Sequence, residues 1–133
     1  MLTLLKDVHA ELRLAIAELA REAAKSEPDP DRLPATRLKL SRLSGRRRSL
    51  IEGEILPSLH ELAPEDARKI ADLRREATAI MVETSEHIAE WTTRQIVADW
   101  PGYQRASAAM RGAMLLRIDR EAAVLYPLLA RTS

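Results

Sequence analysis

The sequence predicts an all-α protein, an up-down-up-down antiparallel four-helix bundle that forms a single domain over residues 1–133. Ala, Leu, Arg and Glu dominate a chain with 46% hydrophobic, 31% charged and only 3% aromatic residues, which is a helix-forming composition. Alternating runs of β-branched and aromatic residues, typical of strands, are missing. The 133 residues are enough for one hydrophobic core and too few for two.

Helix-breaking residues divide the chain into four predicted helices. The first runs over about 2–25 and ends before SEPDPD, and the second runs over about 33–62 with Pro34 in its first turn. The third runs over about 64–99, where the acids of APED favour the positive end of the helix dipole. The fourth covers about 103–131, after a turn predicted at WPGY. Because the links are short, we expect neighbouring helices to be antiparallel.

Each predicted helix carries polar residues in its apolar stripe. Alternating three- and four-residue spacing of apolar residues marks the core-facing side of a bundle helix. The polar residues found in these stripes are His9, Arg47, Glu54, His87, Arg117 and Glu121. At about 1.5 Å of rise per residue, antiparallel helices bring them into one slab of the bundle. The sequence therefore predicts a buried polar site.

One design occurs twice in the chain. The segment RRSLIEGEILPSL (47–59) aligns on its proline with LLRIDREAAVLYPLL (115–129), which matches Arg47 with Arg117 and Ile51 with Glu121. Together with LLKDVHAELR in the first helix and EHIAEW in the third, this repeat resembles the hemerythrin-like (HHE cation-binding) family. The resemblance covers nearly the whole chain.

The resemblance implies a four-helix bundle that holds a non-haem di-iron centre through about five histidines and two carboxylates. The residues of this chain that match or adjoin such ligands are His9, Glu83, His87 and Glu121. The chain has only three histidines, so the usual ligand set is incomplete.

Arginines occupy two of the positions where the family has histidine ligands. Arginine stays protonated and only donates hydrogen bonds, so it cannot bind a cation, but its planar guanidinium pairs well with carboxylates. We therefore expect a buried charge cluster of Arg47, Glu54 and Arg117 with Glu121 in place of the metal. No cofactor is predicted; non-haem iron is the group to expect if one binds.

The segment TRLKLSRLSGRRRS (36–49) contains six basic residues, and no acid lies between Asp31 and Glu52. It is either a solvated helical face or a patch that attracts a small anionic ligand or a protein partner. The residues of that patch would be Arg42, Arg46 and Arg48. Aromatic residues are not interleaved with the basic ones, so nucleic acid is not favoured.

Several other functions lack the residues they need. Without Cys the chain has no disulfide or thiolate site, and no apolar run is long enough to span a bilayer, so we expect a cytoplasmic protein. Gly-rich phosphate loops and nucleophile elbows are also missing. Histidine phosphotransfer would need an exposed histidine, whereas His9 and His87 fall in the apolar stripes.

Three functions remain open. We favour a hemerythrin-like sensor, binding or interaction module without a complete di-iron site, which a fully paired polar slab would support. The second is a protein with a mononuclear or atypical non-haem iron site that handles oxygen, nitric oxide or metal ions. The third is an enzyme acting on a small anionic substrate, which a solvent-connected pocket with unpaired Arg47 and Arg117 would favour. A non-enzymatic role is preferred, and a homodimer is left open.

Overall fold

The computed structural model describes residues 1–132, and all regular secondary structure in that range is helical. The elements in chain order are α1 (Leu2–Ala23), α2 (Arg32–Leu50), the π-helical turn η1 (Ile51–Ile55), α3 (Leu56–Ser58), α4 (Pro64–Glu90), α5 (Thr93–Ala98) and α6 (Trp100–Thr132). The predicted all-α class is confirmed. None of the helices in the described range has the length and apolarity needed to cross a membrane.

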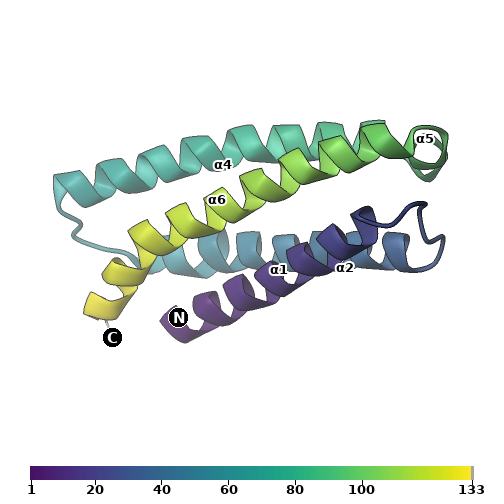
Figure 1. The fold of residues 1–133 in the computed structure, drawn as a ribbon. Helices are drawn as coiled ribbons and strands as arrows, with labels where there is room; N and C mark the ends of the chain where they lie inside the picture. The colour runs from purple at the N-terminus through teal and green to yellow at the C-terminus, as the bar shows by residue number, and fades with distance from the viewer. Residues whose placement is uncertain (133) are drawn as a thin grey trace.

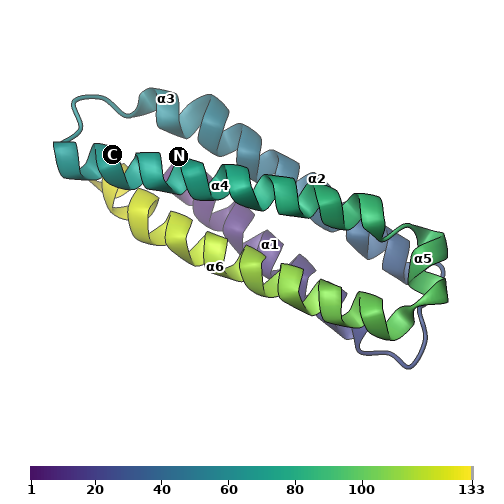
Figure 2. The ribbon, with the colours of Figure 1, turned by 90° about the horizontal axis from the view of Figure 1, so that it is seen from above.

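The long helices α1, α2, α4 and α6 lie alongside one another, and the chain direction alternates from each to the next (Figure 1). α1 and α2 form one layer, and α4 and α6 form the other (Figures 1 and 2). α1 packs against α2 and α6, and α6 packs against α4. The site described below lies between these layers.

The two layers contribute unequally to the core. α1 buries nearly all of its predicted stripe, with Leu5, Leu12 and Leu19 at most 1% exposed. By contrast, Leu73 is the only residue of α4 that is buried in the described structure, although α4 has 27 residues. The stripe predicted in this helix is half-buried over most of its length. The inner face of α4 is therefore only partly covered by other side chains.

The third and fourth predicted helices have other boundaries than expected. α4 ends at Glu90, and Thr92 caps α5 by accepting a hydrogen bond on Oγ1 from the backbone N–H of Gln95 at 3.2 Å. WPGY is not a turn but the start of α6, where Asp99 accepts a hydrogen bond from the backbone N–H of Gly102 at 3.0 Å. Both boundaries differ from the prediction because a short polar side chain caps the start of the next helix.

The π-helical turn η1 removes Glu54 from the core, contrary to the sequence prediction. Its wider turn inserts one residue relative to an α-helix, so the buried face continues through Ile51 and Ile55 instead of Glu54. Glu54 is exposed. The predicted helix over 33–62 also ends earlier, because Leu59 adopts extended backbone after Ser58.

Candidate functional site

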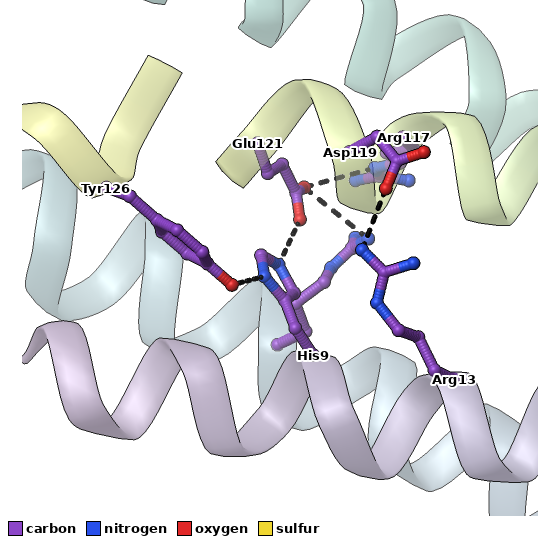
Figure 3. Close-up of polar contacts among 7 residues, drawn as sticks. His9, Arg13, Arg117, Asp119, Glu121 and Tyr126 are labelled. Carbon is purple, nitrogen blue, oxygen red and sulfur yellow. Dashed lines mark hydrogen bonds and ion pairs between the residues drawn. The ribbon is translucent and has the colours of Figure 1, made fainter. Parts of the chain in front are cut away.

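Glu121 is the centre of a buried polar network between α6 and α1. Its carboxylate points from α6 toward His9 on α1 (Figure 3), and both side chains are almost fully buried. Glu121 Oε1 lies 2.9 Å from His9 Nε2. The other oxygen, Oε2, faces two guanidinium groups, those of Arg117 and Arg47. We call the set His9, Arg47, Arg117, Glu121 and Tyr126 the polar network.

His9 is held on both ring nitrogens. A carboxylate only accepts hydrogen bonds, so His9 Nε2 carries the proton that is donated to Glu121. In the neutral ring Nδ1 is then an acceptor, and the Tyr126 hydroxyl donates to it at 2.7 Å (Figure 3). Burial raises the pKa of Tyr126, which keeps the hydroxyl protonated as this donor. His9 is therefore fixed in one orientation and one tautomer.

The two arginines of the network are not equivalent. Arg117 Nε donates to Glu121 Oε2 at 3.4 Å along the same helix. Arg47 Nη1 lies 3.5 Å from that oxygen as an ion pair, and Arg47 Nε is buried without a hydrogen-bond partner. Burial lowers the pKa of Arg47 to about 10, against the opposing pull of Glu121, and burial also lowers the pKa of Arg117. Two cations, one buried and one partly buried, thus share one carboxylate.

A cavity of about 460 Å³ lies beside the network, between α2, α4 and α6. Four arginines line it, and none of its lining residues in the described part of the chain is acidic. They are Arg37, Arg47, Arg48 and Arg117. Most of the remaining lining is apolar, with serine and threonine hydroxyls among it. The volume falls within the range of small-molecule sites, about 300–1,000 Å³.

The far end of this cavity is aromatic. His87 and Trp91 line it, and His87 packs against Tyr103 with ring centroids 6.0 Å apart. Arg37 donates to the Trp91 carbonyl at 2.8 Å and lies over the Tyr103 ring. His87 Nε2 is buried without a hydrogen-bond partner, and burial together with the nearby Arg37 lowers the pKa of His87.

Of the four predicted metal ligands, only His9 and Glu121 come together. His9 and Glu121 are hydrogen-bonded, whereas His87 lies at the aromatic end of the cavity and Glu83 is exposed. Within residues 1–132, no three His, Asp or Glu side chains are grouped closely enough to hold a metal ion. The residues present do not fit a di-iron centre, because donor-only arginines face the carboxylate that would bind it.

The predicted basic patch on α2 is only partly connected with the cavity. Arg48 is exposed at the cavity and lines it, while Arg42 and Arg46 are exposed and absent from its lining. Arg46 instead pairs with Glu11 of α1 at 3.2 Å. Of the three, only Arg48 belongs to the candidate site.

Sequence reasoning missed Tyr126 and Arg37. Tyr126 lies off the predicted stripe of the fourth helix, and its contact with His9 joins residues 117 positions apart. Its place directly before Pro127 gave no signal of a hydrogen bond. Arg37 belongs to a run of basic residues, and nothing in its spacing marks it as part of the site.

A comparison of the chain with protein-family models, with curated proteins and with solved structures found no match. The polar network and the cavity are therefore the features that indicate the function.

Proposed function

We propose that this protein is a non-catalytic binding or sensor module: a four-helix, up-down-up-down bundle of the hemerythrin-like type that binds a small organic anion instead of a metal. The polar network takes the place of the metal centre, since guanidinium groups supply the positive charge beside Glu121. The cavity next to it is the ligand site.

The observation that carries this proposal is the charge of the cavity. Four guanidinium groups line it, without any carboxylate among the described lining residues. Arg47 has a buried Nε without a partner, and its ion pair with Glu121 is long at 3.5 Å. A ligand carboxylate would give these donors short, charge-assisted hydrogen bonds, and a planar guanidinium fits a carboxylate in a bidentate manner.

The alternative functions have less support. Iron binding through His9 and Glu121 would have to displace the short hydrogen bond between them and tolerate Arg47 and Arg117 alongside. For an enzyme, a nucleophile within reach of an activating base would be expected in the cavity. In the described structure His87 Nε2 has no hydrogen-bond partner, so it is not hydrogen-bonded to a serine or threonine hydroxyl of the lining.

Titration of the protein with organic carboxylates and their neutral amides tests the proposal. Trp91 lines the cavity, so its fluorescence reports binding. We expect saturable binding of carboxylates, weakened about tenfold or more in Arg48→Gln, since a hydrogen bond to a charged group contributes about 1.5–3 kcal/mol. The control Arg32→Gln removes the same charge from an exposed α2 position outside the cavity.

Three results would contradict the proposal. Equal binding of amides and carboxylates, or equal weakening by Arg32→Gln and Arg48→Gln, would show that the cavity does not select anions. Elemental analysis of protein produced with iron supplies the second check. One or two iron atoms per chain, lost in His9→Ala, would favour the metal-binding alternative.

A further inference from the structure

We infer that the ligand is a free medium-chain aliphatic monocarboxylate, bound with its head between Arg47, Arg48 and Arg117 and its chain between α2 and α4. This inference rests on the proposed binding of an organic anion and specifies its chemical class. It follows from how charge and apolar surface are distributed along the cavity.

The register of the helices separates the two ends of the cavity. Arg37 near the start of α2 bonds to Trp91 directly after α4, and Glu52 after α2 pairs with Arg74 in the first half of α4. The two helices are therefore antiparallel, which places Arg47 and Arg48 level with Ile80. The ion pair of Arg120 with Glu76 places Arg117 at nearly the same level. Three cations thus gather at one end.

Beyond this cationic end the lining is mainly apolar. Met110 and Met114 of α6 and Leu40 of α2 form the inner wall. Leu38, Met81 and Ile88 line the cavity while being 42–51% exposed, so apolar side chains also form its rim. Flexible methionine side chains adapt to an alkyl chain. A ligand that carried only charge would leave this surface in contact with water.

The weak burial of α4 indicates that an apolar group would complete the core beside this helix. Apart from Leu73, the inward residues of this helix are half-buried, and several of them line the cavity. An aliphatic chain would cover Ile80 and its neighbours and complete the packing between the layers. The alkyl chain would thus cover the apolar part of the cavity. The carboxylate head group would accept a hydrogen bond from Arg47 Nε.

The length of the cavity limits the length of the alkyl chain that it can hold. Arg37 and Arg47 lie at opposite ends and are ten residues apart on α2, which corresponds to about 15 Å of helix. Trp91 and His87 line the end opposite the three arginines. A carboxylate with a medium-length alkyl chain spans this distance, whereas a long-chain fatty acid would have to protrude through the rim.

A chain-length series tests the inference directly. Acetate, hexanoate, octanoate, decanoate, dodecanoate and hexadecanoate are titrated by calorimetry below their micellar concentrations, with decanol and decylamine as head-group controls. We expect one molecule per chain and a Kd that falls about fourfold per added methylene, which corresponds to about 0.8 kcal/mol, up to decanoate or dodecanoate. Decanol and decylamine should bind at least tenfold more weakly than decanoate.

Two variants report on the two ends separately. Arg48→Gln, at an exposed position where folding is not at risk, should weaken every carboxylate by a similar factor. Thr84→Phe introduces a ring into the middle of the cavity and should shift the optimum toward shorter chains. Arg32→Gln serves as the charge-matched control and should leave the series unchanged.

The outcomes distinguish the inference from the proposed function beneath it. If acetate binds as tightly as decanoate, the chain-binding inference is overturned while anion binding stands. If decanol matches decanoate, both are overturned. Several bound molecules per chain, with no effect of Arg48→Gln, would indicate detergent-like association and overturn the inference. Co-sedimentation with phosphatidylglycerol vesicles but no binding of free carboxylates would overturn it in favour of membrane lipid.

Discussion

The arginines in two regions of this molecule differ in how completely their guanidinium groups are paired. Between α1 and α6, Arg117 and His9 bond to Glu121, and Tyr126 bonds to the other ring nitrogen of His9 (Figure 3). Between α2 and α4, Arg47 is 5% exposed, makes one long ion pair and leaves Nε unpaired at the edge of a cavity. The first region is packed around its charges, and the second is not.

This difference separates charged side chains that stabilise the fold from charged side chains that serve a function. A buried charge costs several kcal/mol of solvation unless hydrogen bonds and a close counterion replace the water. Glu121 meets that requirement through His9 and Arg117, and we attribute a structural role to these two contacts. Arg47 meets it only in part, as expected for a group that awaits a ligand anion.

The largest expected effect follows from removing the shared carboxylate. Glu121→Ala leaves the buried Arg47 and the partly buried Arg117 without this counterion and His9 Nε2 without an acceptor. We expect the free energy of unfolding to fall by about 3–5 kcal/mol, measured by urea denaturation with far-UV circular dichroism. The exposed pair Arg120–Glu76 provides the control, because Glu76→Ala should cost at most about 1 kcal/mol. Equal losses in both variants would show that the polar network is not a buried unit.

Arg47 should behave in the opposite way. Arg47→Met removes a charge whose burial is poorly compensated and keeps the volume apolar, while Arg117 still neutralises Glu121 and His9 still donates a hydrogen bond to it. We expect the free energy of unfolding to rise by about 1 kcal/mol, within the range measured when buried charges are replaced by hydrophobic residues, while anion binding is lost. A fall of more than about 1 kcal/mol in the same urea titration would mean that Arg47 is structural.

The pH dependence gives this comparison a second readout. The pKa of Arg47 is lowered in the folded protein to about 10, so between pH 10 and the ordinary pKa of arginine the unfolded chain binds more protons than the folded one. The Arg47 contribution to stability is thus unfavourable and constant below pH 10 and becomes less unfavourable above it. The advantage of Arg47→Met over the natural chain should therefore shrink as pH rises past 10.

Periodicity predicted the α1 side of the molecule well and the α2–α4 side poorly. The stripe of α1 is buried as expected, including His9, because an uninterrupted α-helix keeps one face inward. On α2 the same rule fails after Leu50, since a π-helical turn changes the residue that faces the core, which explains the error at Glu54. Nothing in the spacing of IEGEI distinguishes a π-turn from an α-helix.

The cavity could not be predicted from the sequence either. An apolar stripe shows which face of a helix points inward but not how closely the neighbouring helix approaches. The stripe of α4 resembles that of α1 in composition, with Ile70, Leu73 and Ile80, yet it remains half-buried for most of its length. Which arginines line a shared space depends on this separation, so Arg37 and Arg48 could not be assigned to one site.

The smallest predicted effect tests whether the space beside α4 is unfilled core. Thr84 is half-buried in the cavity lining, whereas Thr78 on the same helix is exposed and lies outside it. Leucine at either position gains the same helix propensity, up to about 0.7 kcal/mol, so the difference between Thr84→Leu and Thr78→Leu isolates cavity filling. We expect Thr84→Leu to be more stable than Thr78→Leu by about 1 kcal/mol, since it buries added apolar surface in existing space. Hydrogen exchange of the α4 amides should slow in Thr84→Leu alone. Equal stabilities and unchanged exchange would mean that α2 and α4 already close on one another in solution, leaving no room for the proposed ligand.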